Sequence, residues 1–191
     1  MTVRDGNGDT PLHEACFHGH NEIVMVLLDK MKSSNGAPDM IKVNVKNNAG
    51  LTPFHIACCE NHHKIVELLL DTHMYQDLLK ECDNDKATPL HYACRNDSVD
   101  TVILLAKKSS NLYKFLTPKT NDGVTPIHVA AQYGCVNVME EFLKKAKNAR
   151  IVSEVVNVRD TYDQTPLHYA TEYGKTKMMT LLLMRYLYIY R

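Results

Sequence analysis

Five histidines recur within one six-residue motif, and histidines at regular spacing could be metal ligands or general bases. The motif is TPLHYA at 88–93 and 165–170, with the variants TPLHEA at 10–15, TPFHIA at 52–57 and TPIHVA at 125–130. If each copy lies on its own helix, neighbouring copies are about 8–10 Å apart. Zinc ligands lie within roughly 2.0–2.3 Å of the ion. We therefore reject a shared metal site for His13, His55, His91, His128 and His168.

Cysteines and further histidines cluster at CFHGH, 16–20, and CCENHH, 58–63. Neither has a recognised zinc spacing, such as C-x₂-C paired with H-x₃₋₅-H. Cys16, Cys58 and Cys94 occupy the same position of the motif, which indicates a small side chain packed between helices. Cys59 falls at a position that we expect to face the surface, where it could be an exposed thiol.

Other catalytic signatures are missing from the sequence. It contains no nucleophile elbow, no Walker loop and no glycine-rich dinucleotide fingerprint after a strand. We therefore predict that the chain is not an enzyme, and that it has no catalytic residues, no metal and no cofactor.

The motif itself predicts how a helix begins and ends. Threonine is a good N-cap, and proline suits the first helical position, where its missing N–H is not needed. Nine residues after each threonine stands Gly19, Asn61, Asp97, Gly134 or Gly174, and these residue types favour the left-handed conformation that ends a helix. The sequence therefore predicts a short first helix in each copy.

An apolar block follows each short helix and predicts a second one. In the first copy, Ile23, Val24, Leu27 and Leu28 have the spacing of one buried helical face. The segment before each Thr-Pro is rich in Asp, Asn and Gly, which favours a turn. Lys86 and Asp163 replace a glycine of that turn, which suggests a slightly altered tip in the third and fifth copies. One such helix pair cannot bury its own face, so neighbouring pairs must stack.

The combined pattern, D-x-x-G-x-T-P-L-H-x-A followed by G-H-x-x-I-V-x-L-L, resembles the ankyrin repeat. That resemblance implies an all-α solenoid of five helix-turn-helix repeats with long inter-repeat loops, and a motif histidine that is a hydrogen-bonded strut between neighbouring turns. We predict a single domain, 1–191, with repeats 1 to 5 at approximately 2–43, 44–79, 80–116, 117–156 and 157–191.

The repeats are longer than the usual ankyrin period of about 33 residues. The extra residues follow the second helix and end in apolar residues, which predicts an additional helical turn or a packed loop. The expected anchors are Ile41 and Val43, Leu78 and Leu79, Phe115 and Leu116, and Val155 and Val156.

Composition limits the environment and the partners. The formal net charge is zero and no basic cluster is present, which argues against a nucleic-acid partner. No run of 18 apolar residues or signal peptide appears, so we expect no direct membrane insertion and, with six cysteines read as reduced thiols, a cytoplasmic location. The apolar tail MRYLYIYR, 184–191, leads us to expect that the chain is part of a longer protein or ends against a partner.

Recognition must depend on positions where the copies differ. In ankyrin repeats these are turn residues and the exposed face of the first helix, which line a concave groove. Carried onto this chain, the candidate partner-binding residues are Phe17, His18, Leu51, Cys59, Arg95, Asn96, Val124, Gln132, Tyr133, Tyr162, Glu172 and Tyr173.

Three functions are compatible with the sequence. The first is a non-catalytic scaffold that binds a protein or peptide partner in its groove. The second is the cytosolic ankyrin segment of a membrane ion channel, since joints such as YQDLLKECDNDKATPLHYA resemble those of ankyrin-type transient receptor potential channels. The third is a substrate-recruiting module of a larger enzyme.

Overall fold

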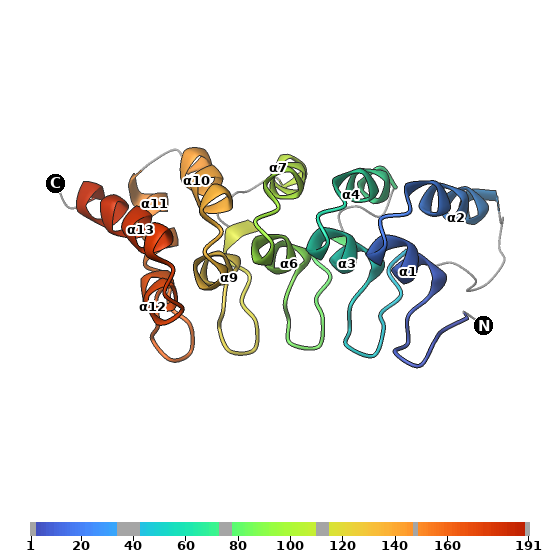
Figure 1. Ribbon diagram of the computed structural model, residues 1–191, viewed down its shortest axis with the longest axis horizontal. Coiled ribbons are helices and arrows are strands. Elements are labelled where there is room, and N and C mark those ends of the chain that lie inside the picture. Colours follow the sequence, from blue (N-terminus) through green and yellow to red (C-terminus); the bar gives the residue numbers. More distant parts are fainter. Residues whose placement is uncertain (1–2, 34–42, 73–77, 110–114, 147–148, 190–191) are drawn as a thin grey trace. The chain divides into compact units, whose positions relative to one another are not determined.

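The computed structural model describes residues 3–33, 43–72, 78–109, 115–146 and 149–189, and their regular structure is helical with no strand among them (Figure 1). This confirms the predicted all-α fold class. The short first helices of the repeats are α1 (Pro11–Phe17), α3 (Pro53–Cys59), α6 (Pro89–Arg95), α9 (Pro126–Tyr133) and α12 (Pro166–Glu172). The second helices are α2 (Asn21–Ser33), α4 (His63–Leu70), α7 (Val99–Lys108), α10 (Val136–Lys145) and α13 (Thr176–Ile189), and α11 (Ala149–Val156) lies between α10 and α12.

Each first helix begins as its Thr-Pro pair predicts. Thr10, Thr52, Thr125 and Thr165 are N-caps with extended backbone, and a proline follows each of them. The side chain of the motif histidine completes the cap, because its Nδ1 accepts the backbone N–H of the threonine, at 3.1 Å in repeat 1. This is the role that Glu or Gln has in an ordinary capping box.

Left-handed residues end the first helices at the predicted positions. Gly19, Gly134 and Gly174 have φ of 72°, 74° and 65°, and Asn61 and Asp97 have φ of 57° and 51°. The chain then reverses into the second helix, so that the two helices of one repeat pack together, as α1 does with α2 and α3 with α4.

The second helices confirm the predicted apolar face with one exception. Val24 and Leu28 of α2 are buried and Leu27 is half-buried, but Ile23 is exposed, which corrects its assignment to the buried face. The equivalent residue in repeat 2, Ile65, is completely buried in α4, which packs against α2. The reason for the difference is that this position faces the preceding repeat, and repeat 1 is the first repeat of the structure.

The extra residues of the long repeats are anchored as expected where the structure describes them. Val43, Leu78, Leu116, Val155 and Val156 are all buried, and Leu79 and Phe115 are half-buried, whereas Ile41 lies outside the described residues. In repeat 4 the additional segment forms helix α11, which packs against α13.

Contacts divide the chain into two compact units, unit 1 (1–89) and unit 2 (90–191). In unit 1, α1 packs on α3 and α2 packs on α4. Unit 2 has the same pattern, since α9 packs on α12, while α10 packs on α7 and α13. In both units, therefore, first helices pack on first helices and second helices on second helices. A single five-repeat domain over 1–191 stays a prediction.

Candidate partner-binding surface

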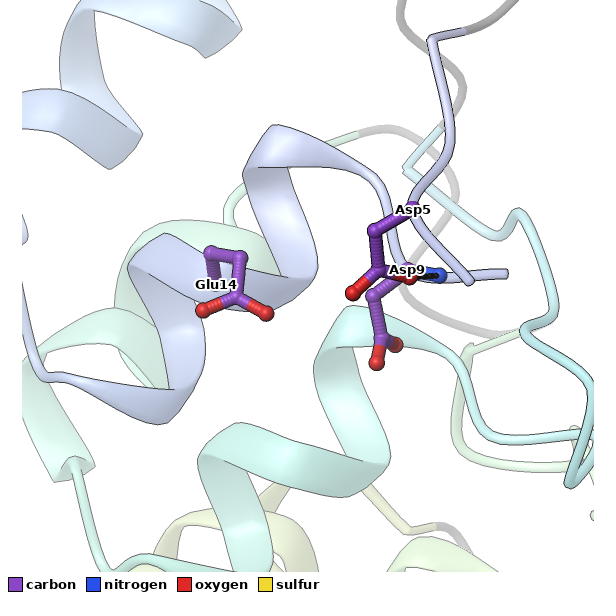
Figure 2. A group of neighbouring side chains, drawn as sticks. All are labelled: Asp5, Asp9 and Glu14. Atoms are coloured by element: carbon purple, nitrogen blue, oxygen red, sulfur yellow. Dashed lines mark hydrogen bonds between the residues drawn. The ribbon is translucent and has the colours of Figure 1, made fainter. Parts of the chain in front are cut away.

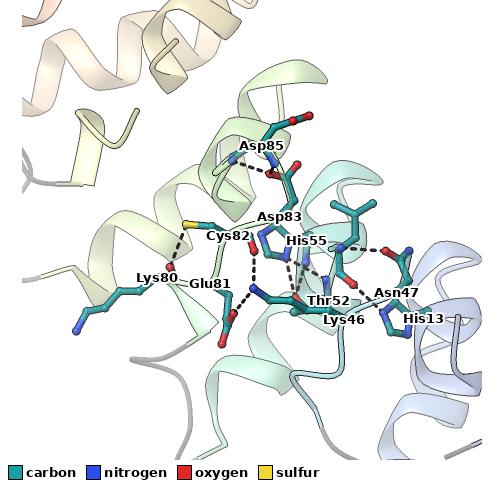
Figure 3. A network of polar contacts seen from close by, with 12 residues as sticks. His13, Lys46, Asn47, Thr52, His55, Lys80, Glu81, Cys82, Asp83 and Asp85 are labelled. Carbon is teal, nitrogen blue, oxygen red and sulfur yellow. Dashed lines mark hydrogen bonds and ion pairs between the residues drawn. The ribbon is translucent and has the colours of Figure 1, made fainter. Parts of the chain in front are cut away.

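The motif histidines join neighbouring repeats. In Figure 3, His13 of repeat 1 reaches the turn that precedes repeat 2, where its Nε2 lies 3.0 Å from the carbonyl oxygen of Leu51. Nδ1 already accepts the threonine N–H, so Nε2 must carry the proton and donate it to this carbonyl. His91 and His128 make the same contact with the carbonyls of Val124 and Gln164, at 3.1 Å in both cases.

These histidines are held in their neutral form. Burial lowers the pKa of His13 and His128, and it lowers the pKa of the fully buried His55 to about 4. In His13 and His128 both ring nitrogens are engaged in hydrogen bonds, so neither offers a lone pair to a metal or to a substrate proton. The motif histidine, which could have been a metal ligand or a general base, is therefore a structural residue that links neighbouring repeats.

Side chains also fix the shape of each turn before a Thr-Pro pair. Asp83 Oδ1 accepts the backbone N–H groups of Asp85 and Ala87, at 2.9 and 2.7 Å (Figure 3). The left-handed residues Lys86 and Asp163 have φ of 64° and 63°, against 80° at the equivalent Gly50. The turn is therefore retained at both replacements, with a somewhat smaller φ than in the glycine turns.

Positively charged side chains link neighbouring turns by hydrogen bonds to backbone carbonyls. Arg4 donates to the carbonyl of Lys46 at 2.8 Å, and Lys46 donates to the carbonyl of Cys82 at 2.6 Å and pairs with Glu81 at 3.0 Å (Figure 3). In unit 2, Lys119 donates to the carbonyl of Arg159 at 2.9 Å. Within each unit, these bonds hold neighbouring turns together, and the variable side chains project from those turns.

In unit 1 the structure brings two candidate residues together at the end of α1. Phe17 and His18 are both exposed, and their rings meet edge to face with centroids 5.0 Å apart. His18 also stacks on His20 and lies 3.5 Å from Glu14. Leu51 and Cys59 are half-buried.

In unit 2 an exposed pair links repeats 3 and 4. The guanidinium carbon of Arg95 lies 5.3 Å from the ring centroid of Tyr133, which is cation–π geometry. Tyr173 is also exposed, and it occupies the position in repeat 5 that Tyr133 occupies in repeat 4. Asn96, Tyr162 and Glu172 are exposed as well, whereas Val124 and Gln132 are half-buried.

The cysteines of the repeated position belong to the core. Cys16, Cys58 and Cys94 are completely buried, and burial raises the pKa of each thiol, to about 12 for Cys16. Protonated, buried thiols are poor nucleophiles and poor metal ligands. Their role is to fill space between helices, as their position in the repeat indicated.

Three carboxylates gather on the first turn and helix, where Asp5, Asp9 and Glu14 each offer an oxygen within 4.8 Å of the others (Figure 2). Two of them already have structural partners. Asp5 Oδ1 accepts the N–H groups of Asn7 and Asp9, at 2.9 and 2.8 Å, and Asp9 Oδ1 accepts the Asn47 amide at 2.8 Å. These bonds account for the positions of Asp5 and Asp9.

Two side-chain contacts, one between repeats and one within repeat 5, were not foreseen from the sequence. Asp97 was predicted only as a left-handed residue, but its carboxylate also accepts the Val138 N–H at 3.0 Å and the Asn137 amide at 2.7 Å, which caps α10 of the next repeat. Within repeat 5, Tyr169 donates to Asp160 at 2.8 Å, and burial, together with this bond, raises the pKa of the tyrosine. The residue types alone carry no signal for either pairing, because the partners are nine or more residues apart.

Comparison with known families agrees with this architecture. A model of ankyrin repeats matches residues 1–73, 33–115 and 110–190, which together span nearly the whole chain. The chain belongs to the ankyrin-repeat family. Ankyrin repeats are generally protein-interaction modules and are generally not catalytic.

Two curated proteins that share ankyrin-type sequence are similar to the chain. Transient receptor potential cation channel subfamily A member 1 of Homo sapiens is 26% identical over 209 aligned residues, which cover 96% of this chain and 18% of the channel protein. An ankyrin repeat-containing protein of Schizosaccharomyces pombe is 29% identical over 104 residues, which cover 54% of this chain and 42% of that protein. The chain thus spans less than half of the length of either relative. Across the ranges that the structure describes, none of its helices is long and apolar enough to cross a membrane.

Proposed function

We propose that the chain is a non-catalytic interaction module that binds a protein or peptide through exposed residues of its turns and first helices. The observation that carries the proposal is the exposed aromatic and arginine surface of unit 2, formed by Arg95, Tyr133 and Tyr173. Tyrosine and arginine are enriched among the residues that dominate binding energy at protein interfaces. Tyr133 and Tyr173 lie on consecutive repeats whose first helices, α9 and α12, are in contact.

The surrounding scaffold supports this proposal. Hydrogen bonds within and between repeats engage the motif histidines, the carboxylates of the turns, and the cations that join one turn to the next. The exposed side chains named above project from that support, so little conformational entropy has to be lost when a partner binds. The formal net charge of zero argues for a protein or peptide partner and against nucleic acid.

The test is a double substitution, Tyr133→Ala with Tyr173→Ala, in the full chain. Partners captured by the wild-type chain from a cell extract are identified by mass spectrometry, and the affinity for the strongest one is measured by calorimetry. We expect the double variant to bind about tenfold or more weakly, because loss of hot-spot residues typically costs above 1 kcal/mol each. Both rings are exposed, so the melting temperature should stay the same.

The matched control is Met25→Ala, which removes an exposed apolar side chain from a second helix in unit 1. This variant should bind as the wild type does. Unchanged binding by the tyrosine double variant would contradict the assignment of the surface.

A second function is favoured by the likeness to the human channel subunit, which extends over 96% of this chain. In this proposal the chain is an ankyrin segment of a membrane cation channel, and it lies outside the membrane. Sequencing of the complete transcript tests it directly, because a set of apolar spans downstream of the repeats would favour the channel. A transcript without such spans would leave the scaffold as the proposed function.

A further inference from the structure

The junction between repeats 3 and 4 has a carboxylate at the start of a second helix. Asp97, the left-handed residue that follows α6, accepts the N–H of Val138 at 3.0 Å and the side-chain amide of Asn137 at 2.7 Å. A negative charge is favourable at this end of a helix, because the first N–H groups have no partners within the helix. Repeat 3 thus supplies a carboxylate to the first turn of α10.

The junction between repeats 4 and 5 lacks this carboxylate. Gly134 stands nine residues after its motif threonine, as Asp97 does, but it has no side chain. Lys177 and Met178 are the second and third residues of α13, as the two donors to Asp97 are in α10. Repeat 4 therefore has no acidic side chain at the place from which Asp97 reaches the next helix.

An open hollow is found at this place in unit 2. It has a volume of ≈ 250 Å³, and its lining includes the turn after α9 and the start of α13, with Tyr133, Gly134, Lys175, Lys177 and Met178. The aliphatic part of Lys175 lies over Gly134, because a Cβ added to the glycine would be 3.0 Å from Cδ of the lysine. The ammonium groups of two lysines are thus available to a molecule that enters the hollow.

Positive charge and an aromatic ring dominate the surroundings of the hollow. Lys175 is half-buried and Lys177 is exposed, and among the described residues neither ammonium group has a hydrogen bond or an ion pair. Tyr133 is exposed, and the guanidinium carbon of Arg95 lies 5.3 Å from the centroid of its ring. The described residues that line the hollow include no acidic side chain. The site is therefore complementary to a negatively charged group.

We infer that the hollow binds an aspartate or glutamate side chain of the partner, so that the segment bound by unit 2 is an acidic peptide. This inference rests on the proposed function and specifies the partner of the same surface, to which Tyr133 belongs. The carboxylate of the partner takes the place that Asp97 takes one repeat earlier. It accepts the N–H of Met178 and pairs with the ammonium groups of Lys175 and Lys177. Such charge-assisted hydrogen bonds are roughly twice as strong as neutral ones.

A library of random dodecapeptides displayed on phage, selected on the full chain, tests the chemistry of the partner. We expect the selected peptides to share an aspartate or a glutamate. The same peptide with asparagine or glutamine in its place should bind about tenfold more weakly by fluorescence anisotropy, because the charge-assisted bonds are lost. Added salt should weaken the binding of the acidic peptide more than that of the neutral one.

Substitution of the two lysines tests the position of the carboxylate. Lys175→Gln with Lys177→Gln should bind the acidic peptide about tenfold more weakly and the neutral peptide as the wild type does, since only the acidic peptide has a charge to pair. The matched control is Lys144→Gln with Lys145→Gln, which changes the net charge equally in the last turn of α10. This control should bind both peptides as the wild type does.

Gly134→Asp places a carboxylate of the chain itself in the hollow. Asp97 has a φ of 51° at the equivalent position, against 74° at Gly134, so aspartate is compatible with this backbone. The atom of Lys175 that a Cβ would approach belongs to a flexible side chain, which can move. The variant should bind the acidic peptide about tenfold more weakly, because the two carboxylates compete for one place.

Gly134→Ala is the control, because it has the same left-handed backbone without the charge. It should keep most of the affinity for the acidic peptide. Thermal unfolding without peptide gives a second measurement, in which Gly134→Asp should melt at a higher temperature than Gly134→Ala, since its carboxylate caps α13. Circular dichroism checks that both variants fold.

The possible results separate this inference from the proposed function. Selected peptides that depend on Tyr133 and Tyr173 but share no acidic residue would overturn the acidic partner and leave the interaction surface intact. Equal binding of the acidic peptide to Gly134→Asp and Gly134→Ala would do the same. A library that yields no peptide, or only peptides that bind equally to Tyr133→Ala with Tyr173→Ala, would overturn both.

Discussion

At the scale of the residue, the motif histidines have a structural role although imidazole is a side chain that often takes part in catalysis. His13 accepts one hydrogen bond from its own repeat and donates one to the next, and burial lowers its pKa. A neutral ring is required for both bonds, because a protonated Nδ1 could not accept the threonine N–H. The same side chain therefore makes the fold sensitive to acid.

The first prediction concerns this sensitivity at His55. Its pKa in the folded chain is about 4, below the unfolded value of 6.5, so its contribution to stability is fully present above pH 6.5 and is lost as the pH falls toward 4. The loss from this one residue amounts to about 3 kcal/mol across that window. Urea unfolding at a series of pH values between 7.5 and 4.5 measures it.

The matched variants are His55→Gln and His168→Gln. The free energy of unfolding of His55→Gln should depend less steeply on pH, by about 1.4 kcal/mol per pH unit within the window. The matched control, His168→Gln, replaces the exposed motif histidine of repeat 5. If the free energy of unfolding depended on pH equally steeply in the wild type and in His55→Gln, the acid sensitivity could not be attributed to His55.

Residue-scale expectations from the sequence had mixed outcomes. The threonine caps, the left-handed Asn61 and Asp97, and the buried repeat cysteines are confirmed. Ile23 is wrong as a buried residue, because its burial depends on a neighbouring repeat and not on its own helix. The partner-binding role of Phe17, Arg95, Tyr133, Tyr162, Tyr173 and the other variable residues stays a prediction.

At the scale of the element, the turns before each Thr-Pro pair decide how closely repeats approach. Gly50 has a φ of 80°, and a Cβ added to it would lie 2.6 Å from the backbone nitrogen of Asn84 in the next turn. Gly174, after α12, has a φ of 65°, and a Cβ there would meet nothing within 4 Å. The two glycines share the left-handed conformation. Of the two, only Gly50 also has to lack a side chain so that the next turn can approach its backbone closely.

The second prediction follows from this pair. Gly174→Ala should lower the free energy of unfolding by about 1–2 kcal/mol, which is the cost of a left-handed alanine. Gly50→Ala should lower it by about 1–3 kcal/mol more, because the added methyl group collides with backbone that cannot move away as a side chain can. Urea unfolding of both variants provides the comparison, and equal losses would show that the turns can separate freely.

At the scale of the whole molecule, contacts concentrate within two units, 1–89 and 90–191. In repeat proteins, stability is approximately a sum of repeat and nearest-neighbour terms, so a lesion is felt mainly where it is made. Phe54 in unit 1 and Phe142 in unit 2 are both completely buried and offer a matched pair of lesions.

The third prediction is that each lesion acts within its own unit. Replacement of a buried phenylalanine by alanine costs about 3–5 kcal/mol. Phe54→Ala should therefore speed amide hydrogen exchange chiefly in 1–89, and Phe142→Ala chiefly in 90–191, as read by mass spectrometry of peptides. Equal acceleration in both units by either variant would show that the whole chain unfolds as one cooperative body.

The period, the start and end of each short helix and the fold class could all be predicted from the sequence, because caps, prolines and left-handed residues act on the backbone within a few positions. Tertiary packing sets which histidine nitrogen faces which carbonyl, that Asp97 caps α10, and that Ile23 lies open while its equivalents are buried. These features depend on the neighbouring repeat. The periodicity of the sequence implies that such a neighbour exists, but it does not show which atoms of that neighbour lie close by. A stacked repeat buries its apolar faces, and finds partners for its bridging hydrogen bonds, only against its neighbours.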